Sequence, residues 1–284
     1  MGEIIDSIRK VEENSNNPEI SPKELADIID HTELSPYATE DSLSRLCKDA
    51  KNYKFHSVCV NPCYTEFCSE RLKDEEGIEV DTVVGFPLGQ TTSEEKAFEA
   101  KESIENGASE IDMVMNIGAF KDGKYDEVKK DIKTVVNAVQ NRIVKVIIES
   151  GYLTYGEILK ASELVKEADA DFVKNATGFG PYGANIPHIH QMRKAVGGDF
   201  GVKAAGGIHN SREALRMIAA GANRIGASSG VEIIKSYKDA NQEEWEVEDN
   251  LCLLCPSRMV SENEVPEPVF RYYRSFCKNC QAKL

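Results

Sequence analysis

The chain has 284 residues, of which 41% are hydrophobic and 29% charged, a composition typical of a folded globular protein. Its formal net charge of −14 argues against a general nucleic-acid-binding protein and against attachment to an anionic membrane surface. No apolar run approaches the ~20 residues of a membrane span. The N-terminal sequence is too charged for a secretory signal, so we expect a cytoplasmic protein whose eight cysteines are thiols or metal ligands.

A polar extension, residues 1–20, precedes a region in which short apolar, β-branched runs alternate with helical patterns. These runs are residues 28–31, 57–60, 81–84, 110–115, 144–148, 172–174, 201–204 and 223–226. Continuous apolar character of this kind is typical of parallel strands that are buried on both faces.

Helix signals fill the intervals between the runs. Thr39 caps a segment whose apolar residues follow the i, i+3, i+4, i+7 spacing, and Ser93 begins a second helix. Pro187 suits the first turn of a third helix, and Ser211 caps a fourth. Eight strand–helix units within residues 21–238 predict an α/β protein with a (β/α)8 barrel. The alternative is an open doubly wound sheet, which is disfavoured because no GxGxxG motif opens the first unit.

Two lysines, Lys174 and Lys203, end neighbouring predicted strands, six and seven. In such a barrel the carboxyl ends of the strands carry the active site. Desolvation there and a second ammonium nearby both lower the pKa of a lysine. A neutral lysine can attack a carbonyl group and form a Schiff base. The alternative is that each lysine anchors a phosphate or serves as an ion-pair partner, but the pairing of two lysines favours chemistry.

Glycine-rich stretches follow three late strands, at residues 178–183, 206–207 and 226–230. Glycine lets backbone N–H groups approach an anion, and Ser229 is placed to open a short helix whose N-terminus holds phosphate. Loops after strands seven and eight are the usual phosphate site of such barrels.

A carboxylate inside an apolar strand is costly unless it is paired. Asp112 is such a residue, and it is either a proton relay or the salt-bridge partner of a barrel lysine such as Lys145. Asp30 on the first strand is a second carboxylate of this kind. Glu149, just past the fifth strand, is a third, and we interpret it as a structural partner.

Taken together, these segments resemble the deoxyribose-phosphate aldolase family, in order and spacing, over residues 22–235. The motifs that carry the resemblance are Ile29–Thr32, Glu110–Gly118, Lys145–Glu149, Phe172–Gly180, Gly201–Ile208 and Gly226–Ser229. The resemblance implies a (β/α)8 TIM barrel and a class I aldolase that interconverts 2-deoxy-D-ribose 5-phosphate with acetaldehyde and D-glyceraldehyde 3-phosphate. It implies that catalysis needs no cofactor and that the protein is a homo-oligomer, such as a dimer.

The resemblance also implies roles for individual residues. Lys174 is then the Schiff-base lysine, Lys203 the lysine that perturbs it, and Asp112 the carboxylate that relays protons through water. The substrate-binding residues are then Asp30, Cys59, Thr177, Gly178, Gly206, Gly207, Gly226, Ser228 and Ser229.

Four positions depart from the family pattern. Asn175 and Ala176 follow the first lysine where the family usually has Thr and Ser, Ala205 replaces a serine, and His209 stands where arginine is common. The lost hydroxyls and the lost guanidinium predict weaker phosphate binding or a shifted substrate preference. An altered barrel that acts on a related substrate, or that serves as a binding or regulatory module, is therefore the alternative function. The retained Lys174, Lys203 and Asp112 favour the enzyme.

The barrel pattern ends in an acidic linker, residues 239–250, and a cysteine-bearing tail follows at residues 251–284. The tail carries two CxxC pairs, Cys252, Cys255, Cys277 and Cys280. Four thiolates at this spacing predict a structural zinc site in a ribbon-like appendage, against unpaired thiols or a redox pair. The family resemblance does not cover this tail, and its partner is not predicted.

Overall fold

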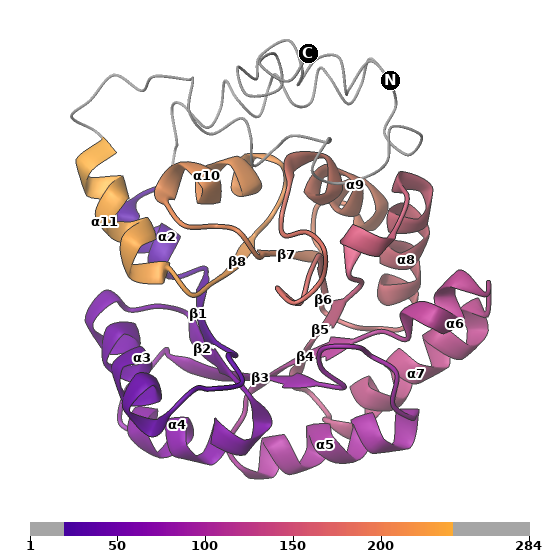
Figure 1. Cartoon of the computed structure of the whole chain (residues 1–284), viewed down its shortest axis with the longest axis horizontal. Helices are drawn as coiled ribbons and strands as arrows, with labels where there is room; N and C mark the ends of the chain where they lie inside the picture. The colour runs from indigo at the N-terminus through magenta and orange to yellow at the C-terminus, as the bar shows by residue number, and fades with distance from the viewer. Residues whose placement is uncertain (1–19, 241–284) are drawn as a thin grey trace.

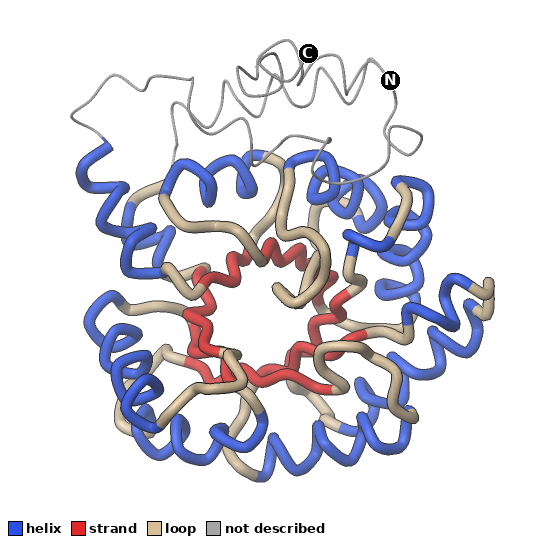
Figure 2. The backbone as a smooth tube through the Cα atoms, in the orientation of Figure 1, coloured by secondary structure: helices blue, strands red, loops and turns tan. Residues whose placement is uncertain are grey.

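The computed structural model describes residues 20–240, which form a closed barrel of eight parallel strands in chain order, surrounded by helices (Figures 1 and 2). The strands are β1 (Ile29–Glu33), β2 (Ser57–Val60), β3 (Glu79–Val84), β4 (Glu110–Val114), β5 (Ile143–Ile147), β6 (Phe172–Lys174), β7 (Gly201–Ala205) and β8 (Arg224–Ala227). The barrel closes because β8 pairs with β1, so the predicted (β/α)8 fold is confirmed and the open sheet is excluded.

The helices pack on the outside of the barrel and connect its strands. They are α2 (Pro22–Ala26), α3 (Glu40–Tyr53), α4 (Thr65–Leu72), α5 (Ser93–Glu105), α6 (Ile117–Lys121), α7 (Tyr125–Ala138), α8 (Tyr155–Glu167), α9 (Ile186–Val196), α10 (Ser211–Ala219) and α11 (Gly230–Ala240), with 3₁₀ turns η1 (Pro62–Tyr64) and η2 (Ser150–Tyr152). Helices α2 and α11 lie side by side (Figure 1), and the Tyr237 hydroxyl donates a hydrogen bond to the Ile20 carbonyl.

The predicted helix starts are correct to within one residue. Thr39 caps α3 as expected. The predicted start of a helix at Ser93 is confirmed, whereas the predicted cap Ser211 is wrong by one position, because it lies inside the first helical turn. The capping residues are Thr92 and Asn210, whose backbones are extended and whose side chains accept hydrogen bonds from backbone N–H groups of the first turn.

Successive residues of each strand face opposite sides, and the two sides of this sheet differ chemically. The outward residues pack under the helices and are apolar, as Ile111 and Met113 of β4 are. The intervening positions, Glu110 and Asp112, contact charged side chains from other strands across the barrel interior. The predicted burial of the strands on both faces is therefore confirmed, and the inner face carries paired charges rather than apolar side chains.

Within residues 20–240, no helix is both long and apolar enough to cross a membrane. The acidic linker from residue 241 onward, the cysteine tail and residues 1–19 lie outside the described residues.

Candidate active site

The three residues that the sequence singles out for catalysis meet inside the barrel. Lys174 of β6 and Lys203 of β7 are register partners on adjacent strands. The Nζ atoms of both lysines lie 2.7 Å from the same oxygen, Oδ2 of Asp112 on β4. Lys174 is 3% exposed, whereas Lys203 and Asp112 are fully buried. One carboxylate oxygen therefore links the two lysines.

The second oxygen of Asp112, Oδ1, lies 2.9 Å from Nζ of Lys145. The salt bridge considered as an alternative role for Asp112 is thus present together with its contacts to the other two lysines. Burial raises the pKa of Asp112, but the cations of Lys145, Lys174 and Lys203 hold that pKa well below its usual range. Asp112 is therefore a carboxylate at neutral pH.

Lys203 differs from Lys174 in the number of its carboxylate partners. Besides Asp112, its Nζ lies 2.5 Å from Asp30 and 2.9 Å from Asp81. Burial lowers the pKa of Lys203, but these carboxylates more than offset the effect and hold the pKa well above its ordinary value. Lys203 therefore stays charged, and its charge is locally neutralised.

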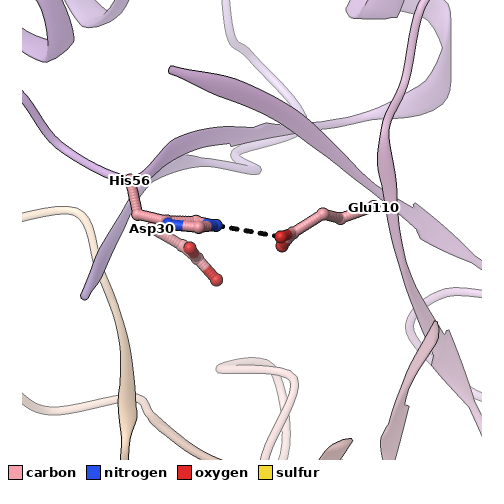
Figure 3. A group of neighbouring side chains, drawn as sticks. All are labelled: Asp30, His56 and Glu110. Atoms are coloured by element: carbon pink, nitrogen blue, oxygen red, sulfur yellow. Dashed lines mark hydrogen bonds and ion pairs between the residues drawn. The ribbon is translucent and has the colours of Figure 1, made fainter. Parts of the chain in front are cut away.

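At the other end of the barrel, Glu110 on β4 contacts His56, Asp30 lies beside this pair (Figure 3), and Arg224 contacts both carboxylates. The oxygens of Asp30 and Glu110 and a nitrogen of His56 are close enough together to hold a metal ion. However, Arg224 lies 3.0 Å from both carboxylates and Lys145 lies 2.6 Å from Glu110. These cations already neutralise the carboxylates and would repel a metal ion. The group is therefore better described as the end of an ion-pair network.

We call this set of buried, mutually paired side chains the barrel charge network. Its members are Asp30, Asp81, Glu110, Asp112, Lys145, Lys174, Lys203 and Arg224. The four carboxylates balance the four cations in formal charge. Asp81, Glu110 and Arg224 were not predicted as site residues. Charged residues within apolar strands were the signal that could have identified them, and Glu110 and Asp112, two positions apart in β4, are the clearest case.

A pocket of about 320 Å³ opens at the carboxyl ends of the strands. Of the predicted substrate-binding residues, those that line it are Thr177, Gly178, Gly206, Gly207, Gly226 and Ser228. Lys174 is the one member of the barrel charge network among the lining residues. Ser229 lies beside the pocket, with its hydroxyl 3.3 Å from Nδ1 of the lining residue His209.

The structure places two predicted substrate-binding residues, Asp30 and Cys59, outside the pocket lining. Both are fully buried in the barrel, where Asp30 pairs with Lys203 and Arg224. Burial raises the pKa of the Cys59 thiol well above its ordinary value, so the thiol is protonated. In this structure both side chains are enclosed among charged neighbours of the barrel interior and do not line the pocket, and their contact with a substrate stays a prediction.

The glycine loops that flank the pocket touch each other directly. Gly206 has φ of +88°, a left-handed conformation that favours glycine, and its carbonyl accepts a hydrogen bond from Ala184 N–H. A Cβ atom on Gly183 would lie 2.3 Å from that carbonyl oxygen. Glycine at 183 therefore allows the loop after β6 to pack on the loop after β7.

One departure from the family pattern, Asn175, has a clear structural role. Its amide nitrogen donates to the Ala205 carbonyl (3.1 Å), and its amide oxygen accepts from the Ala205 N–H (2.7 Å). The side chain thus joins the ends of β6 and β7, next to the two lysines. Ala176 is fully buried, so it does not contact the pocket.

The fold and this site define a (β/α)8-barrel enzyme with one lysine placed for carbonyl chemistry. A family model described as DeoC/LacD family aldolase matches residues 25–236, and the chain belongs to that family.

Individual relatives agree with this assignment. The chain is 52% identical over 216 residues to a deoxyribose-phosphate aldolase of Thermoanaerobacter, covering 75% of this chain and 96% of the relative. It is 55% identical over 218 residues to one of Aciduliprofundum boonei, covering 76% and 98%. Among solved structures, a deoxyribose phosphate aldolase from Aeropyrum pernix, described as a tetramer, superimposes with a TM-score of 0.76 at 31% identity, covering 81% of this chain and 97% of that one.

The barrel charge network predicts that removal of Lys145, a buried member, destabilises the fold more than removal of Lys121, which lies outside the network. Lys145→Met leaves Asp81, Glu110 and Asp112 short of a buried cation, so we expect a loss of about 3–5 kcal/mol in unfolding free energy. The matched control is Lys121→Met, which breaks a partly exposed pair with Glu157 and should cost less than about 1 kcal/mol. Urea denaturation measures both, and equal losses would contradict this account.

Proposed function

We propose that this chain is a class I aldolase, a lyase that reversibly cleaves 2-deoxy-D-ribose 5-phosphate to acetaldehyde and D-glyceraldehyde 3-phosphate. The observation that carries the proposal is the position of Lys174, whose Nζ is 2.7 Å from the Asp112 carboxylate and which lines the pocket. Family membership and relatives of that name at 52% and 55% identity support the same reaction.

In the first step, Nζ of Lys174 attacks C1 of the open-chain sugar. Loss of water from the carbinolamine then forms an iminium ion between the lysine nitrogen and C1. Asp112 is ionised and within hydrogen-bond distance of this nitrogen, so it can accept the proton that the lysine releases.

In the second step, the C3 hydroxyl gives its proton through a water molecule to Asp112, and the C2–C3 bond breaks. The bonding electron pair moves through C1 to the iminium nitrogen, which gives an enamine and releases glyceraldehyde 3-phosphate. Asp112, acting through a water molecule, returns a proton to C2. Water then hydrolyses the iminium ion, which releases acetaldehyde and restores Lys174. Because the iminium nitrogen serves as the electron sink, this cycle needs no cofactor.

Lys203 supports the cycle without forming the covalent bond. Its permanent charge holds Oδ2 of Asp112 in place beside the reacting nitrogen. The phosphate group would lie against the backbone N–H groups of Gly206 and Gly207 and the hydroxyl of Ser228, which line the same pocket.

The proposal extends to location and assembly. We place the enzyme in the cytoplasm, where phosphorylated sugars are metabolised, and we expect a homo-oligomer such as a dimer. The tetramer described for the Aeropyrum pernix relative supports assembly but not a particular number of subunits.

We expect sodium borohydride with acetaldehyde to add a reduced two-carbon group to Lys174, because this lysine lines the pocket. Lys174→Ala should lose essentially all turnover, since no other group replaces the imine. Asp112→Asn should lower kcat by about 10²-fold or more. Peptide mapping by mass spectrometry checks the adduct. Lys96, a buried lysine paired with Asp131 outside the barrel, is the internal control and should stay unmodified. An adduct on Lys203 alone would contradict the assignment.

A second prediction concerns the phosphate. We expect 2-deoxyribose 5-phosphate to be cleaved far faster than 2-deoxyribose, because the glycine loops offer backbone donors to an anion. Steady-state kinetics with both sugars measure the preference. Equal rates would mean that Ala205 and His209, which line the pocket in place of serine and arginine, have changed the substrate, as in the alternative function considered above.

A third prediction concerns the cysteine tail. We propose one structural zinc ion per chain, bound by Cys252, Cys255, Cys277 and Cys280, because four thiolates fill a tetrahedral shell and leave no position for water. Chelation should therefore remove the metal and leave the aldolase activity largely intact. Elemental analysis with thiol titration of the native protein checks the site, and four freely reactive tail thiols would refute it.

A further inference from the structure

Glu149, at the end of β5, is fixed to the loop that follows Lys174 by its neighbours on both sides. The N–H of Ile148 donates to the Lys174 carbonyl (3.0 Å), and the N–H of Ser150 donates to the Asn175 carbonyl (2.7 Å). Between them, Glu149 has φ of +47° and ψ of +64°, a left-handed conformation that is unfavourable for glutamate. Strained backbone of this kind persists where the surrounding structure holds it, often at functional sites.

The side chain of Glu149 is 1% exposed and is committed to one residue of that loop. Both the backbone N–H and the hydroxyl of Thr177 donate to Oε2 of Glu149, at 3.0 and 2.5 Å. Oε1 is buried and has no hydrogen-bond partner among the residues that the structure describes. Because two donors converge on Oε2, this oxygen acts as an acceptor. The proton of the Thr177 hydroxyl is therefore used in the hydrogen bond to Glu149.

The remaining bonding capacity of the Thr177 hydroxyl can be counted. A hydroxyl group has one proton to donate and two lone pairs that accept. Its proton goes to Glu149, and one lone pair accepts the N–H of Phe179 at 3.0 Å. One lone pair remains. Thr177 lines the pocket that Lys174 also lines, whereas Glu149 does not.

We propose that Glu149 is a positioning residue that fixes the Thr177 hydroxyl as a hydrogen-bond acceptor in the pocket, so that the site selects acceptor aldehydes that carry a free hydroxyl group. The inference rests on the proposed aldolase function. In the synthetic direction of that reaction, D-glyceraldehyde 3-phosphate has a single free hydroxyl group, on the carbon next to its aldehyde. This hydroxyl can donate a hydrogen bond to the remaining lone pair of the Thr177 hydroxyl oxygen.

The test compares two acceptors, with acetaldehyde as the donor in both reactions: glyceraldehyde 3-phosphate, and 3-oxopropyl phosphate, which lacks only that hydroxyl. We expect the native enzyme to prefer the hydroxylated acceptor in kcat/KM by about tenfold, as one hydrogen bond provides. Thr177→Val, which keeps the shape but not the hydroxyl, should lower the ratio to about one. Thr177→Ser should keep the preference.

Variants of Glu149 distinguish two roles for this residue: acceptor of the hydrogen bond from the Thr177 hydroxyl, or structural support of the loop after Lys174. Glu149→Leu removes the acceptor, so the freed hydroxyl proton turns towards the pocket and the preference should disappear. Glu149→Gln should keep the preference, because its amide oxygen can occupy the Oε2 position and its nitrogen the unpartnered Oε1 position. Circular dichroism and thermal unfolding show which variants fold.

Three outcomes would overturn the inference: Thr177→Val keeps the native ratio, folded Glu149→Gln loses it, or Glu149→Leu slows both acceptors equally. If Glu149→Leu does not fold, Thr177→Val still decides. The borohydride adduct of acetaldehyde on Lys174 needs no acceptor aldehyde. An adduct without acceptor preference would therefore reject this inference while leaving the proposed function intact.

Discussion

Pairing of charges inside a closed barrel is the constraint on which the rest of this structure depends. A charge away from water is costly unless opposite charges and hydrogen bonds surround it, and here the four carboxylates and four cations of the barrel charge network meet that requirement together. Asp112 is the central member, because its two oxygens contact Lys145, Lys174 and Lys203. Lys145 and Lys203 hold Asp112 from two sides, and Asp112 in turn holds the ammonium group of Lys174, so the network fixes the position of Lys174.

The same requirement explains how the fold divides its tasks. Outward residues of the strands supply the apolar contacts that hold the helices, and inward residues supply the electrostatics of the site. Lys174 differs from the other lysines of the network because, within residues 20–240, it pairs with a single carboxylate, Asp112, and because it reaches the pocket. Lys145 and Lys203 each contact at least three carboxylates and remain below the pocket.

Much of the fold could be predicted from the sequence because its signals are local. Strand spacing, the cap at Thr39 and the strand-end lysine Lys174 can each be read from a few neighbouring residues. The charge network could not be predicted in full, because its contacts join residues far apart, such as Asp81 and Lys203, which are 122 positions apart. Asp30 and Cys59 were assigned to the pocket by resemblance alone, and only the depth of a side chain in the barrel reveals that they lie beneath it. The bonds of Glu149 to Thr177 likewise depend on tertiary structure.

The two-way pairing of Asn175 with Ala205 has a consequence for the breadth of the pocket. An amide side chain that bonds both groups of a facing peptide adds one more rung to the ladder between β6 and β7, beyond the point where the strands end. That wall of the pocket is therefore rigid. The lining also includes Phe179, which is 53% exposed and rests edge-on against Phe86. An exposed aromatic side chain is held less firmly than a peptide group bonded at both ends, so a change in the width of this pocket costs least at Phe179.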